Sequence, residues 1–406
     1  MLRLARRSDW WLLSVCTVTH IFVHVFTMMY TALIPVFMRD FNLTIHEAGL
    51  LVSVPQLISI MLSLPYGFIA DRVDPRKLMA ASLLVAGFSG LLASHSQGFI
   101  MLLASATLVS FSSTVYHPPA LKVLSENFMG ERQSRVLGIH GAGGTTGVAI
   151  GPITLGLMLE GFGWRFAYMV WGLPVLLSAL LTFSLPYGGA VEKPQNDISV
   201  ASGDRRAKSE NHGDENSEKY DRARGYMLLL LATGINSVGQ QALSTYMTTY
   251  LVSARKFSEA NASLLFGLSP FIGIIGSLAG GYFGGKIGNK HWITIAYVGT
   301  AFSHSAIWFG SPWIIAPSYL MGGFFGGSTL APSTTLVARY SSRERRGLAY
   351  TIFMLSPSIV GSVSPLIAAW LVEEHGFTGL FPFTISLTLL STFVLQTLPK
   401  EEHEPS

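Results

Sequence analysis

The sequence predicts an all-α integral membrane protein with twelve transmembrane helices in two six-helix bundles and both termini in the cytoplasm. Three observations lead to this fold class: the chain carries few charges, its uncharged stretches are long, and its positive charges fall on one side. Of 406 residues, 50% are hydrophobic and only 12% are charged, about half the charged fraction of a typical soluble domain. This composition excludes an ordinary soluble globular protein.

Spanning segments are visible as stretches that lack Asp, Glu, Lys and Arg. A bilayer core of roughly 30 Å requires about 20 apolar residues in a helix. Two of the stretches, 78–121 and 291–338, are long enough for two helices each, with turns expected near 95–98 and 310–312. Eight single helices and two pairs make twelve. The ten stretches are 10–38, 48–70, 78–121, 136–159, 166–191, 225–254, 260–285, 291–338, 347–372 and 375–399.

The basic residues indicate the orientation. When the loops are assigned alternately to the two sides, 23 Lys and Arg residues lie on the side of the N-terminus and 4 on the other. Cytoplasmic loops carry the excess of basic residues, so both termini are predicted to be cytoplasmic in the inner membrane. The net charge of +4 is then explained by basic loops on one side of the lipid bilayer, and we expect no nucleic-acid partner. The apolar run 10–38 is too long for a signal peptide and is interpreted as the first spanning helix.

A charged segment divides the helices six and six. Residues 187–224 contain seven basic and eight acidic residues and few large apolar side chains, a composition typical of a flexible linker. We therefore predict a monomer with an N-terminal bundle (1–186), a flexible cytoplasmic linker (187–224), a C-terminal bundle (225–400) and a cytoplasmic tail (401–406). A faint repeat at an offset of 214 residues aligns Gly67 with Gly281 and Asp71 with Gly285, which indicates a parallel duplication.

Polar residues form one stripe along the first helix, at Thr17, His20, His24, Thr27 and Thr31. Their 3, 4, 3, 4 spacing places them on one face. Polar groups at membrane depth are costly against lipid, so this face is expected to meet other helices or a water-filled cavity. The alternative for the hydroxyls is that they bond to carbonyls of their own helix.

Histidines are the side chains of the uncharged stretches that titrate near neutral pH. His20 lies ten residues past Trp10, about 15 Å along the helix and near the middle of the core. His117 and His140 lie five residues from Lys122 and Arg135, and they could face each other on consecutive helices. Glycines that repeat at i, i+4 spacing in helix 5 allow close helix approach, either as a sliding interface between the halves or as static packing.

Two motifs resemble those of a transporter family. Gly67-x-x-Ala70-Asp71-Arg72, followed by Arg76, resembles the loop signature of the major facilitator superfamily, and Gly147-x-x-x-Gly151-Pro152 resembles its antiporter-associated motif. Within that superfamily, Tyr116-His117-Pro118, the run Gly143–Gly147 and His20 are similar to the fosmidomycin-resistance exporter group. The chain departs from these patterns at Asp74-Pro75, at His24 where that group has an acidic residue, and at Pro119 where a Glu often follows His-Pro.

The resemblance implies that helices 1, 4, 7 and 10 line a central cavity. Helix 4 would then contribute Thr114 and His117, and helix 7 Asn236, Gln240 and Gln241. His304 would be structural, because helix 9 is peripheral in the resembled fold. The resemblance also implies that Asp71 approaches the start of helix 11 near Gly347 and acts as a latch, which the second half lacks because it has Gly285 at the equivalent position.

These features predict a secondary active transporter that exports a small organic molecule in exchange for protons by alternating access. The substrate and proton pathway would include His20, His24, Thr27, Thr114, His117, His140, Asn236, Gln240 and Gln241. A transition-metal carrier is an alternative, since His20 and His24 at i, i+4 are spaced to ligate one ion and His117 and His140 could complete the set. Uptake of a small metabolite by symport is another, although a buried Arg or Lys would be expected for a carboxylate. We expect neither enzymatic activity nor a cofactor, because the sequence shows no nucleophile–base pair and no metalloenzyme motif.

Overall fold

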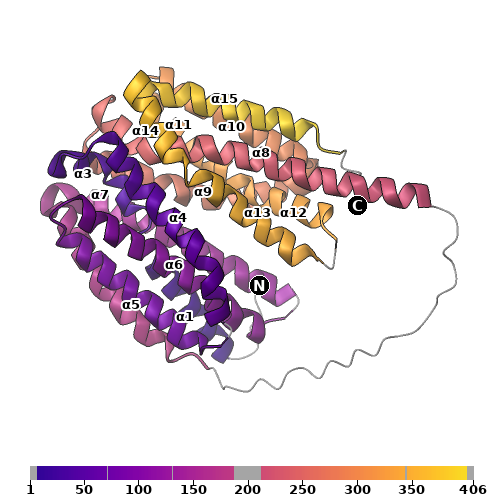
Figure 1. The fold of residues 1–406 in the computed structure, drawn as a ribbon, viewed down its shortest axis with the longest axis horizontal. Coiled ribbons are helices and arrows are strands. Elements are labelled where there is room, and N and C mark those ends of the chain that lie inside the picture. The colour runs from indigo at the N-terminus through magenta and orange to yellow at the C-terminus, as the bar shows by residue number, and fades with distance from the viewer. Residues whose placement is uncertain (1–6, 71, 130, 187–211, 343–344, 400–406) are drawn as a thin grey trace.

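The computed structural model describes residues 7–70, 72–129, 131–186, 212–342 and 345–399. Over these residues every regular element is helical, in two groups that follow each other in the chain (Figure 1). The first group comprises α1 (Arg7–His24), α2 (Met29–Ala32), α3 (Ile34–Phe41), α4 (Ile45–Ala70), α5 (Pro75–Ser94), α6 (Phe99–Asn127) and α7 (Glu131–Thr182). The second comprises α8 (His212–Ser253), α9 (Glu259–Ile287), α10 (Asn289–Phe309), α11 (Pro312–Ser328), α12 (Leu330–Tyr340), α13 (Arg346–Gly361), α14 (Ser364–His375), the 3₁₀ helix η2 (Phe377–Gly379) and α15 (Leu380–Gln396).

Membrane-spanning character is evident in eight helical stretches of the described chain, which are long and apolar enough to cross a bilayer. The two turns predicted inside the long uncharged stretches are confirmed: α5 ends at Ser94 and α6 begins at Phe99, and α10 ends at Phe309 and α11 begins at Pro312. The all-helical membrane fold is therefore as predicted. The number of twelve spans stays a prediction, and so does the cytoplasmic location of the termini.

Helix boundaries differ from the prediction in two places. The first span is not one continuous helix, because α1 ends at His24 and α2 begins at Met29. Between them, the backbone N–H of Thr27 donates to the carbonyl of His24 at 3.0 Å, the tighter i→i−3 pattern of a 3₁₀ turn. The other difference is in α8, whose first residues, 212–224, form a helix in the segment predicted as linker. Residues 187–211 and the tail 401–406 lie outside the described residues.

A single glycine separates the two spans within α7. Gly163 has φ +77° and ψ 168°, a backbone conformation that side chains other than glycine rarely adopt. The chain therefore kinks there, between the uncharged stretches 136–159 and 166–191 that the sequence predicted as separate helices.

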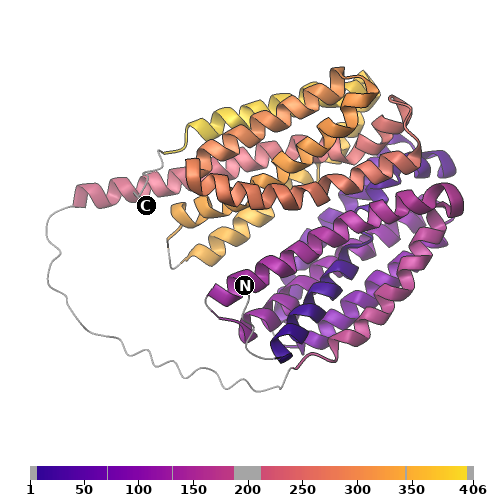
Figure 2. The same ribbon diagram turned by 180° about the vertical axis from the view of Figure 1, so that it is seen from behind.

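Contacts between the two halves gather at one end of the molecule. The hydroxyl of Thr248 donates to the carbonyl of Thr31 at 3.1 Å, and Tyr246 donates to the carbonyl of Ile45 at 2.8 Å. The ion pair Arg39–Glu259 and the hydrogen bond between His46 and Glu373 lie at the same end. In Figures 1 and 2 the halves converge there and diverge toward the opposite end, where α8 begins.

Glycines of α7 and α9 pack in two different ways. A Cβ at Gly147 or Gly151 would lie 2.2 Å from the carbonyl oxygen of Ile21 or 1.9 Å from that of Val25, so these two residues hold α7 against α1 within one half. At Gly267 of α9 a Cβ would lie 2.8 Å from the carbonyl oxygen of Ala149, across the two halves. Close packing inside a half and close approach between the halves therefore both occur, at different glycines.

The loop between α4 and α5 contains the predicted gating motif. Gly67 lies in α4, Arg72 is exposed in the turn, and Asp71 lies outside the described residues. Asp74 caps α5 by accepting from the backbone N–H of Arg76 at 2.9 Å, and it also pairs with the Arg76 side chain at 2.8 Å. Asp at the N-cap followed by Pro at the first helical position is a favourable helix start, which explains Asp74-Pro75 at the point of departure from the resembled family.

Candidate functional site

Four histidines of the first half lie together at the end of α1. The ring centroid of His20 lies 4.9 Å from that of His24 and 5.0 Å from that of His117, and His24 lies 5.2 Å from His117. The ring of His140 stacks on His20 at 4.0 Å. The structure therefore brings together all four predicted histidines, with His140 against His20.

The side chain of His20 is fixed from several sides. Its Nδ1 lies 2.7 Å from the carbonyl oxygen of His140, and because a carbonyl can only accept, Nδ1 carries the hydrogen. On another side, a Cβ at Gly144 would lie 2.5 Å from the Cε1 atom of His20. The glycine run of α7 thus makes room for this ring, which is 5% exposed.

His24 lies at the helix break. It is the last residue of α1, and its Nδ1 lies 3.3 Å from the hydroxyl of Thr27 in the following turn. His24 and His117 are partly buried, so the cluster has a buried side at His20 and a more accessible side. A tight turn inside a spanning segment is a common feature of functional sites.

Thr114, another predicted pathway residue, bonds within its own helix. Its hydroxyl donates to the carbonyl of Ser110 at 3.1 Å, which is the alternative that the sequence left open for hydroxyls. The structure does not place Thr114 among the residues that line the cavity described next.

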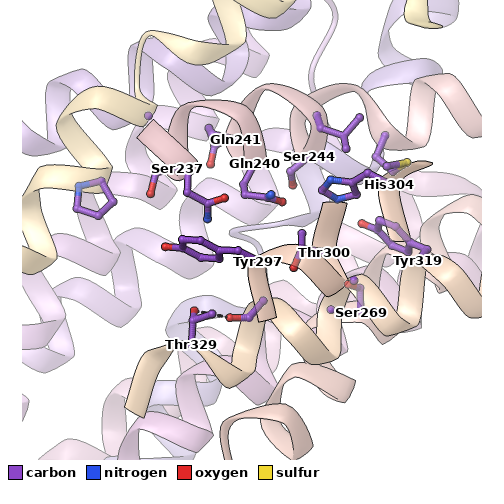
Figure 3. A pocket seen from close by; sticks show the side chains of 18 of the residues that line it. Ser237, Gln240, Gln241, Ser244, Ser269, Tyr297, Thr300, His304, Tyr319 and Thr329 are labelled. Atoms are coloured by element: carbon purple, nitrogen blue, oxygen red, sulfur yellow. Dashed lines mark hydrogen bonds between the residues drawn. The ribbon is translucent and has the colours of Figure 1, made fainter. Parts of the chain in front are cut away.

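A cavity of about 500 Å³ lies mainly in the second half, and α4 also contributes Gln56. The predicted Asn236, Gln240 and Gln241 all line it, since their spacing places them on one face of α8. Figure 3 shows side chains of α8 facing the same space as Tyr297, Thr300 and His304 of α10. None of the described lining residues is Asp, Glu, Lys or Arg.

Two amides of this cavity are oriented by one hydroxyl. Thr388 of α15 donates to the Oδ1 of Asn236 at 3.2 Å and accepts from the Nε2 of Gln240 at 3.3 Å. This pairing leaves the amide nitrogen of Asn236 and the carbonyl oxygen of Gln240 for other partners. The cavity therefore presents a fixed donor beside a fixed acceptor.

His304 was expected to be structural because its helix would be peripheral; its role stays a prediction, but the structure places the side chain at the cavity. Its side chain lines the cavity, is 6% exposed, and has no partner for Nδ1 among the described residues. A signal was present in the sequence: Tyr297, Thr300 and His304 repeat the 3, 4 spacing of the polar stripe on the first helix. The resemblance, which places helix 9 at the periphery, led the interpretation away from that signal.

Comparison with known proteins agrees with this architecture. The family model described as Major Facilitator Superfamily matches residues 16–210 and 229–406. The chain belongs to the major facilitator superfamily. It is accordingly a multi-pass membrane transporter of small molecules and not an enzyme, and the family prediction made from the motifs is confirmed.

Relatives of this chain transport, or confer resistance to, different compounds. The chain is 23% identical over 313 residues to the cis,cis-muconate transport protein of Acinetobacter baylyi, covering 76% of this chain and 75% of that one. It is 25% identical to the fosmidomycin resistance protein of Escherichia coli, covering 73% and 70%, and 22% identical to the multidrug resistance protein MdtG of Salmonella schwarzengrund, covering 88% of each.

A solved structure shares the fold. A bacterial homologue of the human lysosomal transporter Spinster superimposes with a TM-score of 0.77 at 14% identity, covering 97% of this chain and 98% of that one. At this identity the likeness shows the fold alone, and the fold hosts many substrates.

Proposed function

We propose that this transporter exports a small polar organic molecule across the inner membrane in exchange for protons, as a monomer with twelve spans and both termini in the cytoplasm. The observation that carries the proposal is the division of chemistry between the halves: a neutral polar cavity lies in the second, and a cluster of four histidines lies in the first. Both sites come from one chain, so no second copy is required.

The cavity chemistry favours a substrate that is uncharged in its bound form. Amide and hydroxyl groups of α8, α10 and α15 offer paired donors and acceptors, and a charged substrate at membrane depth would lack a countercharge there. A volume of about 500 Å³ falls in the range of small-molecule sites. A symporter for an ionised carboxylate would need a basic residue, which the described lining lacks.

Protons are assigned to the histidine cluster because imidazole changes charge near neutral pH. We propose that protonation at His20 and His24 competes with substrate binding, as exchange requires. The contacts at one end of the halves support alternating access, in a conformation that is closed at that end and open toward the end where α8 begins. On the predicted orientation, this conformation faces the cytoplasm.

The first experiment identifies the substrate and the direction. Metabolite and metal contents are compared in cells with and without the protein, and a compound that accumulates in the deficient cells is a candidate for export. If a compound were instead depleted in the deficient cells and none accumulated, this would indicate uptake and contradict the proposal.

The second experiment tests the coupling. Transport of that compound is measured in proteoliposomes with and without a pH gradient, for wild type, His20→Ala, His24→Ala and the exposed control His291→Ala. Both cluster variants are expected to lose stimulation by the gradient while retaining exchange of labelled for unlabelled substrate. Full gradient stimulation in both cluster variants would overturn the coupling role.

A further inference from the structure

The histidine cluster has the geometry of a ligand set. His20, His24 and His117 each offer one ring nitrogen, and these three nitrogens lie within 4.8 Å of one another. Around a tetrahedral ion with bonds of about 2.0–2.1 Å, such nitrogens are separated by about 3.4 Å. Bringing them together requires movements of about 1.5 Å, and His24 and His117 are the partly buried rings whose side chains can supply them.

The tautomer of His20 leaves a lone pair for a ligand. Because Nδ1 donates to the carbonyl of His140, the Nε2 of the neutral ring is an acceptor. This Nε2 is buried and has no hydrogen-bond partner among the described residues. A buried acceptor without a partner costs free energy, and a bound cation would satisfy it.

The contacts of His20 resemble those of histidines that bind metal ions. Metal-ligating histidines usually donate their other ring N–H to a carbonyl or carboxylate, which fixes the ring. The carbonyl of His140 has this role for His20, the ring of His140 supports it by stacking, and Gly144 packs directly against it. His24 has a comparable partner in the hydroxyl of Thr27.

We propose that His20, His24 and His117 bind a transition-metal ion of the Zn²⁺ or Co²⁺ class, and that this ion inhibits transport. Three imidazoles select such ions over Mg²⁺ and Ca²⁺, which prefer oxygen ligands. The fourth position is left to water on the accessible side of the cluster. A nitrogen that holds the ion cannot bind a proton, so inhibition, unlike binding itself, rests on the proposed proton coupling.

Binding is tested on the full-length protein in detergent, with Co²⁺ as the probe and Zn²⁺ as its competitor. Four-coordinate Co²⁺ gives intense visible absorption, whereas six-coordinate Co²⁺ gives weak bands. We expect one Co²⁺ per chain with the four-coordinate spectrum, displaced by Zn²⁺. His24→Ala and His117→Ala should each weaken binding at least tenfold, and His291→Ala should leave it unchanged.

Two outcomes would overturn the site: a six-coordinate spectrum, or equal Co²⁺ affinity in wild type and the triple variant His20→Ala/His24→Ala/His117→Ala. His24→Gln and His117→Gln keep the polarity and size of the side chains, so their loss of binding separates coordination from a failure to fold. Retained Co²⁺ binding by both would also count against the site.

Inhibition is measured separately, as gradient-driven transport in proteoliposomes titrated with Zn²⁺. Half-inhibition should match the dissociation constant from the competition experiment. Stoichiometric binding without inhibition would overturn the inhibitory role and the assignment of proton coupling to these rings, while the metal site itself would stand. If the wild-type protein bound no Co²⁺ but its transport still responded to a pH gradient, the metal site would be overturned and the proton coupling would stand.

Discussion

The hydroxyl of Ser263 in α9 donates a hydrogen bond of 2.9 Å to the carbonyl of Pro152 in α7. Pro152 belongs to the antiporter-like motif of the first half, and Ser263 is 0% exposed in the second half. This bond therefore joins the halves inside their closed end. It can exist only while that end is closed.

Removal of this bond should favour opening of the closed end. A buried hydrogen bond contributes about 1 kcal/mol, so Ser263→Ala should increase the open population about fivefold. The readout is alkylation of a cysteine at Ala48, which is buried against the second half, in a Cys16→Ser background. Ser178→Ala is the matched control, because the buried Ser178 bonds to the carbonyl of Val175 in its own helix. Unchanged labelling in Ser263→Ala would contradict the prediction.

Two glycine substitutions should have distinct effects. Gly267→Ala places a methyl group 2.8 Å from the carbonyl oxygen of Ala149 across the halves, so it should raise alkylation at position 48 with little loss of folded protein. Gly151→Ala places its methyl group 1.9 Å from the carbonyl oxygen of Val25 within one half and should instead lower the melting temperature. If both variants lose stability and neither changes labelling, these glycines do not differ in function.

How far the sequence predicts this structure depends on whether the deciding interactions are local. Spans and turns follow from hydropathy, and the i, i+4 spacing of His20 and His24 correctly predicts a shared face. The break after His24 carries no Pro or Gly signal within 25–28, and the carbonyls of α1 there pack against glycines more than a hundred residues away. Spacing along one helix cannot reveal such a contact.

Prediction of the cavity from the sequence is limited in the same way, because some of its interactions join distant helices. Asn236, Gln240 and Gln241 are predictable from one helix, but their orientation depends on Thr388, which belongs to α15. His304 could have been recognised by its spacing from Tyr297 and Thr300. The stacking of His140 on His20 depends on how α7 crosses α1, which no local pattern encodes.

The Asp74–Arg76 pair predicts a pH-dependent contribution to stability. The Arg76 side chain, and to a smaller extent its backbone N–H, holds the pKa of the Asp74 carboxyl below its ordinary value. A carboxyl whose folded-state pKa is lowered stabilises the protein above the unfolded-state pKa, and that contribution disappears as pH falls through the folded-state value. Asp74→Asn keeps a capping side chain and loses the ion pair. Its melting temperature should therefore be lower than that of wild type near pH 7 and equal to it in acid.

Asp74→Ala is the companion variant, since it loses the cap as well and should be less stable than Asp74→Asn throughout the pH range. Thermal unfolding in detergent at several pH values between about 3 and 7 measures all three proteins. A deficit of Asp74→Asn that stays constant with pH would show that the ion pair does not contribute.

Thr388 should control substrate affinity without controlling proton coupling. Thr388→Val keeps the shape of this fully buried side chain but removes the hydroxyl that holds the amides of Asn236 and Gln240. The substrate would then have to order both amides on binding, at a cost of about 1.4 kcal/mol, which raises KM about tenfold.

Thr388→Ser restores the hydroxyl and should restore KM. Thr392→Val is the control, because the Thr392 hydroxyl bonds to the carbonyl of Thr388 in the same helix. Substrate exchange without a pH gradient measures KM, and the stimulation by a gradient measures coupling, which should stay intact in Thr388→Val. An unchanged KM in Thr388→Val, or an equal rise in Thr392→Val, would remove the cavity's amide pair from substrate binding.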